Sequence, residues 1–188
     1  MTQDGWELLL SDVTMNLTCY MCVILHKMLM KGWIPASIYR AVQHTWQSTF
    51  LFMSINWIFY REWYWLQSGF FTLHSISLLM KQHSYLSTNR DFEMICRQVQ
   101  GLEGQLKKSD LSAEEKEKME AEIAFLKSEI TTGGTQYPAN VSTRNFIDYM
   151  LVPTLVYDLE YPRTEKFRLM YFLEKRLFSP LSSVCSFL

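Results

Sequence analysis

The sequence predicts an all-α integral membrane protein, and three observations support this fold class. Two stretches, 42–60 and 63–80, contain no Asp, Glu, Lys or Arg. Aromatic residues make up 15% of the chain and gather between positions 46 and 71, and Trp and Tyr favour the membrane–water boundary. The region that follows, 88–130, is charged and carries apolar residues at helical spacing. The chain therefore divides into an apolar part and a polar helical part.

The stretch 42–60 is long enough to cross a bilayer, since nineteen helical residues cover roughly 28 Å. A short polar break at Arg61 separates it from 63–80. The two stretches are therefore predicted to form a tight helical hairpin across the membrane. A third span at 8–25 is weaker because Asp12 interrupts it, and a buried helix of a soluble protein is the alternative there. Residues 1–85 thus hold two to three transmembrane helices.

Lys and Arg predict the orientation of these spans. Cationic residues gather before the hairpin and directly after it, at Lys27, Lys31, Arg40, Lys81, Arg90 and Arg97. The positive-inside rule places both regions in the cytosol, which leaves the start of the chain on the lumenal side. A lumenal start without a signal peptide indicates that an earlier span precedes this sequence.

The region 86–135 is predicted to be a cytosolic, charged helical hairpin. Apolar residues step by three and four in two stripes, Phe92-Ile95-Val99-Leu102-Leu106 and Met119-Ile123-Leu126-Ile130. Self-packing of the two stripes is favoured, because each is too short for an intermolecular coiled coil. A coiled coil with a partner is the alternative.

The region 136–188 is predicted to return to the membrane. Its segment 146–157 is apolar but short, and Asp148 and Pro153 interrupt it. Such a segment suits a re-entrant or interfacial element. The segment 167–177 mixes apolar and charged residues, which predicts an amphipathic helix along the bilayer surface.

Composition argues against several other functions. The net charge is -1 and there is no basic run, so nucleic acid is not an expected partner. Cys19 and Cys22 are spaced like a redox or zinc motif, but they lie in an apolar run without a second pair. Packed thiols are the better interpretation. We predict no metal site and no bound cofactor.

The stretch 149–164 reads Tyr-Met-Leu-Val-Pro-Thr-Leu-Val-Tyr-Asp-Leu-Glu-Tyr-Pro-Arg-Thr. This signature segment resembles the fungal sterol O-acyltransferases of the membrane-bound O-acyltransferase family. Three earlier segments agree in the same order: Lys-Gly-Trp-Ile at 31–34, Gln-His-Thr-Trp-Gln at 43–47, and Gly-Phe-Phe-Thr-Leu-His-Ser at 69–75. Met-Lys-Gln-His-Ser-Tyr at 80–85 follows the last of these.

The resemblance implies the family's fold, in a multi-pass protein of the endoplasmic reticulum membrane. It implies transfer of a fatty acyl group from the co-substrate acyl-CoA to the sterol 3-hydroxyl, with a membrane histidine as the general base. Sterol, acyl-CoA and membrane lipid are the implied partners, and full-length members are expected to be homo-oligomers. None of the four histidines matches the family's catalytic motif, and the later Phe-Tyr-x-Asp-Trp-Trp-Asn motif is absent. We therefore expect a chain truncated at both ends and inactive alone, and assign no catalytic residue.

Two other functions stay open. One is a diacylglycerol acyltransferase of the same family, although Tyr-Pro-Arg-Thr preceded by Glu160 favours the sterol branch. The other is a non-catalytic membrane scaffold that uses 88–130 to bind a partner.

Four residues are predicted to contact substrate: Tyr157, Tyr161, Arg163 and His83. Arg163 is placed to meet the phosphates of CoA, and the two tyrosines would line the same mouth. His83 would help to shape the acyl-CoA entry. The structural alternatives are that Arg163 pairs with a carboxylate such as Glu160 and that His83 bonds a helix end.

His74 lies in the middle of a predicted span. A polar side chain inside a membrane is a functional candidate by default. Nearby Ser75, Ser77 and Gln67 offer it hydrogen-bond partners across a helix contact, which would make its role structural.

Overall fold

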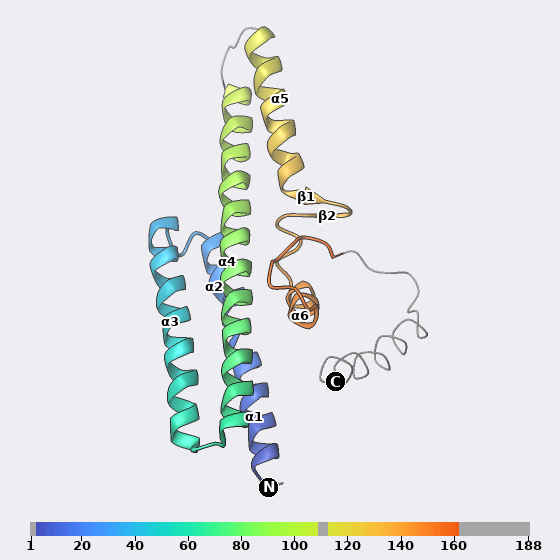
Figure 1. The fold of residues 1–188 in the computed structure, drawn as a ribbon. Helices are drawn as coiled ribbons and strands as arrows, with labels where there is room; N and C mark the ends of the chain where they lie inside the picture. The colour runs from blue at the N-terminus through green and yellow to red at the C-terminus, as the bar shows by residue number, and fades with distance from the viewer. Residues whose placement is uncertain (1–2, 109–112, 162–188) are drawn as a thin grey trace, which may run out of the picture.

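The computed structural model describes residues 3–108 and 113–161 (Figure 1). The described chain is mostly helical, as predicted. Its elements are α1 (Gln3–Thr18), α2 (Met21–Met30), α3 (Ala36–Arg61), α4 (Trp65–Lys108), α5 (Ala113–Glu129), β1 (Thr131–Thr132), β2 (Thr135–Gln136) and α6 (Thr143–Leu151). The two short strands pair antiparallel as a small hairpin.

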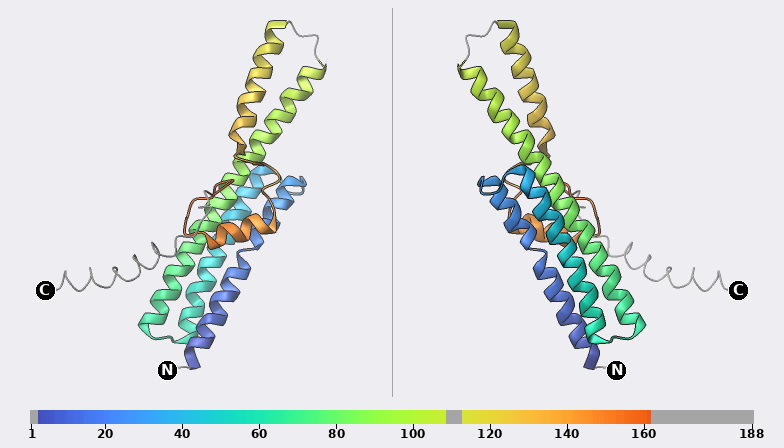
Figure 2. Two further views of the ribbon diagram at one scale, coloured as in Figure 1. Left: turned by 90° about the vertical axis from the view of Figure 1, so that its right-hand side faces the viewer. Right: turned by 90° about the vertical axis from the view of Figure 1, so that its left-hand side faces the viewer.

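The long helix α4 is the axis of the fold. Helices α1, α2 and α3 pack along its first half, and α5 runs back along its second half (Figures 1 and 2). Helix α6 lies across the middle of α4 (Figure 2). The described elements therefore meet around the centre of α4.

Helices α3 and α4 form the hairpin that the charge pattern predicts. Helix α3 ends at Arg61, and Glu62 adopts a left-handed conformation with φ of 49°. A left-handed residue directly after a helix is a common way to end it. Helix α4 begins at Trp65, so the stretches 42–60 and 63–80 lie side by side.

One stretch of the described residues, Gly5–Met30, is long and apolar enough to cross a membrane. The predicted spans 42–60 and 63–80 lie in helices of sufficient length that do not reach this apolarity. By length and apolarity, the N-terminal stretch therefore ranks above the two that were predicted to be the stronger spans, and the number of spans stays a prediction. Freedom from charge is not the same as apolarity, since uncharged amides such as Gln43 and Gln47 are strongly polar.

The outer faces of the first four helices nevertheless expose many large apolar side chains. Examples are Trp6, Leu9, Leu17, Phe52, Met53, Phe59, Trp65, Leu66, Phe70 and Leu73. Soluble monomers rarely expose so extended an apolar surface. This surface is suited to contact with lipid.

A polar pair joins α1 to α4 between these apolar faces. His74 Nδ1 bonds Asp12 Oδ1, and Asn16 Nδ2 donates to the other carboxylate oxygen at 3.2 Å. The expected partners of His74 were wrong, because Ser75 and Ser77 donate to carbonyl oxygens of their own helix. A serine inside a helix commonly bonds the carbonyl one turn earlier.

The second half of α4 and α5 pack through the two predicted stripes. Val99, Ile123 and Leu126 are buried between the helices, and Lys127 Nζ lies 2.7 Å from Glu103 Oε1 at the edge. The stripes thus pack against each other within one chain. The cytosolic location of this helix pair stays a prediction.

Candidate functional site: a cleft beside the signature segment

The signature segment begins in the last turn of α6 and continues as a loop. Ser142 caps the start of α6, where its hydroxyl accepts the backbone N–H of Asn145 at 3.2 Å. The helix ends at Leu151, and Val152 is extended. A residue that precedes a proline avoids helical geometry, so Pro153 accounts for this end.

Lys81 of α4 caps the end of α6. Its Nζ donates to the carbonyl oxygens of Tyr149 at 3.0 Å, Met150 at 2.9 Å and Val152 at 2.7 Å. A helix C-terminus leaves its last carbonyls unpaired, and its dipole favours a cation there. Burial lowers the pKa of Lys81, and the three carbonyls replace the water that its ammonium loses.

The loop after α6 is bonded by Tyr149 of α6 and by Ser84 of α4. The Tyr149 hydroxyl donates to the Leu155 carbonyl at 2.8 Å and lies 3.2 Å from the carbonyl oxygen of Lys81. The backbone N–H of Tyr157 donates to Ser84 Oγ at 2.8 Å. These bonds fix the backbone of the loop where it crosses α4.

Tyr157 points into the protein. Its side chain is 3% exposed, and its hydroxyl donates to Asn145 Oδ1 at 2.7 Å and accepts from Asn140 Nδ2 at 2.9 Å. Asn140 Nδ2 also donates to Asn89 Oδ1 at 2.7 Å. Burial raises the pKa of Tyr157, so its phenol is a neutral member of a buried hydrogen-bond network.

Tyr161 packs on the ring of Tyr149. The ring centroids are 6.0 Å apart and the planes differ by 7°. The Tyr161 hydroxyl accepts the backbone N–H of Asp158 at 2.9 Å. Burial raises the pKa of Tyr161 to about 12.

Glu160 connects the signature segment to the turn between β1 and β2. One of its carboxylate oxygens accepts the backbone N–H of Gly134 at 3.1 Å. The neighbouring Gly133 has φ of +58°, and a Cβ there would collide with the Glu160 carboxylate. Only glycine suits both the conformation and the space.

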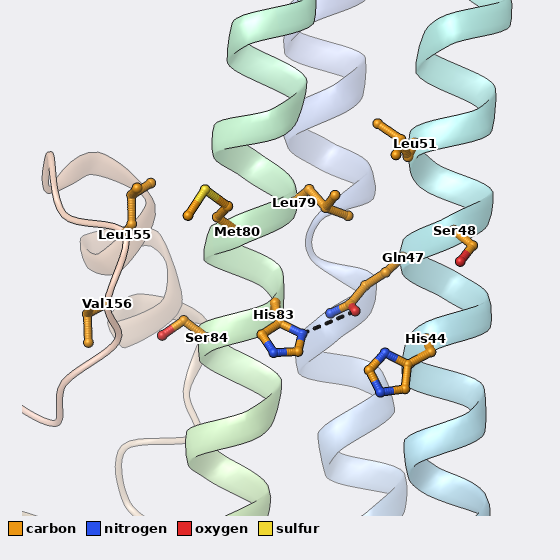
Figure 3. Close-up of a pocket in the computed structure, with 10 residues that line it drawn as sticks. All are labelled: His44, Gln47, Ser48, Leu51, Leu79, Met80, His83, Ser84, Leu155 and Val156. Atoms are coloured by element: carbon orange, nitrogen blue, oxygen red, sulfur yellow. Dashed lines mark hydrogen bonds between the residues drawn. The ribbon is translucent and has the colours of Figure 1, made fainter.

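A cleft of about 520 Å³ opens between α3, α4 and the loop (Figure 3). Its lining residues are His44, Gln47, Ser48 and Leu51 of α3, Leu79, Met80, His83 and Ser84 of α4, and Leu155 and Val156 of the loop. The loop that carries the signature thus forms one wall of the cleft. A volume of this size is typical of small-molecule sites.

Two histidines face each other at one end of the cleft. The rings of His44 and His83 are stacked with centroids 6.0 Å apart, and His83 Nδ1 lies 3.3 Å from Gln47 Oε1. Gln47 is only 7% exposed, and its Nε2 has no hydrogen-bond partner among the described residues. In the described ranges, no three His, Cys, Asp or Glu side chains gather so as to hold a metal ion.

The chain is similar to two enzymes of Saccharomyces cerevisiae over most of its length. Sterol O-acyltransferase 1 is 29% identical over 190 aligned positions, which cover 93% of this chain and 30% of that protein. Sterol O-acyltransferase 2 is 34% identical over 159 positions, which cover 77% of this chain and 23% of that protein. The chain is a relative of the fungal sterol O-acyltransferases. It spans less than a third of the length of these two relatives.

Diacylglycerol O-acyltransferase 1 of Dictyostelium discoideum shares a shorter region with this sterol O-acyltransferase relative. It is 50% identical over 44 residues, or 23% of this chain and 7% of that protein. No family model and no solved structure matches the chain.

The structure places three of the four predicted substrate-contacting residues. His83 lines the cleft. Tyr157 instead points into the protein and Tyr161 packs on Tyr149, and both hydroxyls bond the protein itself. Arg163 lies outside the described residues, as does the predicted amphipathic helix at 167–177. A substrate contact by any of the four stays a prediction.

Sequence reasoning missed His44 and Gln47 as neighbours of His83. Their proximity could have been found from the distance of each residue to the turn between the two helices. His44 lies 17 residues before the end of α3 at Arg61, and His83 lies 18 residues after the start of α4 at Trp65. Two antiparallel helices joined by a short turn bring such positions to the same level, since both rise 1.5 Å per residue.

Proposed function

We propose that the chain forms part of a sterol O-acyltransferase, which transfers a fatty acyl group from acyl-CoA to the 3-hydroxyl of a sterol. The similarity to the two Saccharomyces cerevisiae enzymes over most of the chain is the observation that carries the proposal. In this reaction the thioester C–S bond breaks and an ester C–O bond forms. The hydroxyl proton leaves through a base, and the sulfur departs as CoA.

The geometry supports a role in holding a lipid substrate. The backbone of the signature segment is fixed, because Lys81 and Ser84 of α4 form hydrogen bonds with it. Leu155 and Val156 of this loop form a wall of the cleft. A fixed wall beside an apolar cavity preorganises a site for a hydrophobic molecule.

The proposal extends to the setting of the enzyme. It places a multi-pass protein with the membrane-bound O-acyltransferase fold in the endoplasmic reticulum membrane, with the pair of α5 and the second half of α4 as a cytosolic insert. Acyl-CoA and sterol are the proposed substrates, and a homo-oligomer is the proposed assembly. The exposed apolar faces of α1, α3 and α4 support the membrane placement.

A segment exchange tests the proposed activity. The chain replaces the matching segment of Saccharomyces cerevisiae sterol O-acyltransferase 2 in yeast cells that make no steryl ester of their own. Microsomes then receive labelled acyl-CoA with either a sterol or a diacylglycerol, and the labelled products are separated. The amount of each chimaera in the membrane is measured in parallel, so that loss of protein is not read as loss of activity.

Formation of steryl ester is the expected result. Triacylglycerol without steryl ester would favour a diacylglycerol acyltransferase, a function that the match to the Dictyostelium enzyme supports. If a chimaera present at normal levels makes neither product, the acyltransferase proposal fails and the membrane scaffold becomes the better account.

A further inference from the structure

The cleft beside the signature segment is polar at one end and apolar at the other (Figure 3). His44 and His83 lie at the first end, and Leu51 and Leu79 lie at the second. His44 and Leu51 are seven residues apart on α3, so the two ends are separated by about 10 Å along the helix. The apolar end lies toward the middle of the stretch 42–60. An amphiphile with its polar group near the membrane boundary matches this gradient.

The described residues that line the cleft include no Lys, Arg, Asp or Glu. Lys81 precedes the lining residue His83 by two residues, but its ammonium already donates to three carbonyls at the end of α6. A phosphate from CoA or a phospholipid would find no cationic partner among these described lining residues.

The hydrogen-bonding groups at the polar end match a hydroxyl. Gln47 Oε1 can only accept, so the proton of this bond lies on His83 Nδ1. In the neutral imidazole His83 Nε2 is then an acceptor, while Gln47 Nε2 is a buried donor without a partner among the described residues. A hydroxyl both donates and accepts, whereas an ester or thioester carbonyl only accepts and would leave His83 Nε2 unpaired.

We propose that this cleft binds the hydroxyl end of a lipid alcohol, which donates to His83 Nε2. Leu51, Leu79 and Met80 contact its hydrocarbon body. The inference rests on the proposed function, in which such an alcohol is the acyl acceptor. His83 acts here as a binding residue, and no covalent step is assigned to it. Sterols and diacylglycerols share the required chemistry.

Photolabelling of the 188-residue chain in lipid nanodiscs tests the inference. The probes are a photoreactive sterol with a free 3-hydroxyl, a photoreactive diacylglycerol with a free hydroxyl, the methyl ether of each, and a photoreactive acyl-CoA. Labelled peptides are mapped by mass spectrometry. The free sterol or the diacylglycerol is expected to label peptides covering 44–51 and 79–84. Each methyl ether, which cannot donate, is expected to label them about three- to tenfold less than its free alcohol, as loss of one hydrogen bond predicts.

Variants locate the effect on His83. His83→Phe keeps a ring but removes the acceptor, so it is expected to abolish the preference for the hydroxyl probe over the ether. His83→Gln retains an acceptor oxygen and is expected to restore part of the preference. Ser77→Ala is the matched control, because Ser77 lies on α4 outside the cleft and bonds its own helix.

The comparison of hydroxyl and ether probes needs no variant, so it stands even if a substitution prevents folding. Equal labelling by the two sterol probes would overturn the inference if diacylglycerol labelling also shows no dependence on the hydroxyl. Preferential labelling of these peptides by acyl-CoA would overturn it as well. Hydroxyl-dependent labelling by diacylglycerol alone would support a lipid alcohol and identify its source. The labelling does not depend on catalysis, so failure of the segment exchange and failure of this binding inference are separate results.

Discussion

Lys81 and Tyr149 bind each other reciprocally. The Lys81 ammonium donates to the Tyr149 carbonyl at 3.0 Å and lies 5.1 Å from the centre of its ring, while the Tyr149 hydroxyl lies 3.2 Å from the Lys81 carbonyl. The same hydroxyl donates to Leu155, which lines the cleft. The position of the loop that forms one wall of the cleft therefore depends on Lys81 and Tyr149, which do not line the cleft themselves.

Replacement of Lys81 by Met is expected to loosen the signature loop. The change removes three charge-assisted bonds and leaves helix-end carbonyls unpaired, so the free energy of local opening should fall by about 2–3 kcal/mol. Hydrogen exchange of the amides in 150–157 measures this opening. Lys81→Arg should retain part of the protection, and Lys127→Met serves as a control that removes a solvent-accessible ion pair. Unchanged exchange in Lys81→Met would show that the cap does not hold the loop.

Tyr157→Phe is expected to lower the free energy of unfolding by about 1–3 kcal/mol, since Asn140 and Asn145 each lose a buried partner. Thermal and chemical unfolding in detergent micelles measure the change. Tyr161→Phe is the comparison, because its hydroxyl accepts the N–H of Asp158 at 2.9 Å and donates to the Val156 carbonyl at 3.4 Å at a more exposed position. A loss from Tyr157→Phe no larger than that from Tyr161→Phe would argue against a buried network around Tyr157.

Stability is expected to fall as the pH rises above about 10. Burial raises the pKa values of Tyr137, Tyr149 and Tyr157 in the folded chain. Between the unfolded and folded pKa values the unfolded state binds fewer protons, so deprotonation favours unfolding. The stabilising contribution is fully present below the unfolded value and is lost toward the folded one. The part of the tyrosinate absorbance that comes from these residues should rise together with the loss of helix seen by far-UV circular dichroism, and not before it. Full ionisation with intact helices would contradict the burial.

Two of the helix pairings could be predicted from patterns within the sequence, whereas the break between α1 and α2 and the continuity of α4 over Trp65–Lys108 could not. The single polar break at Arg61 marks the α3–α4 turn because a hairpin needs only one interruption between two apolar runs. The stripes that contain Val99 and Ile123 predict two helices that pack together, because the 3.6-residue period alone sets which side chains share a face.

The partners of individual polar side chains could not be predicted in this way. Asp12 and His74 are 62 residues apart, and their contact depends on how α1 docks on α4. The same holds for Lys81, which follows a predicted span and reads as a charge at its boundary, yet bonds carbonyls of a helix 68 or more residues later. Local periodicity carries no information on such docking, whereas the His44–His83 register does follow from the turn.

The pair of Asp12 and His74 is expected to couple α1 to α4 by about 1 kcal/mol, in the range of hydrogen bonds between membrane helices. A double-mutant cycle with Asp12→Asn and His74→Gln measures this coupling through reversible unfolding in mixed micelles. Both substitutions keep the size of the side chain, so packing losses largely cancel in the cycle.

The ion pair of Glu7 and Arg61 provides the comparison for this cycle, because it also joins α1 to the hairpin but has more exposed side chains on average, at 48% and 28% against 26% and 33%. Solvent screening makes its coupling smaller, at about 0.5 kcal/mol or less. Coupling of Asp12 to His74 within about 0.3 kcal/mol of zero would show that the two side chains stabilise the helix contact independently. Coupling near the expected value would mean that this polar pair helps to hold α1 against α4.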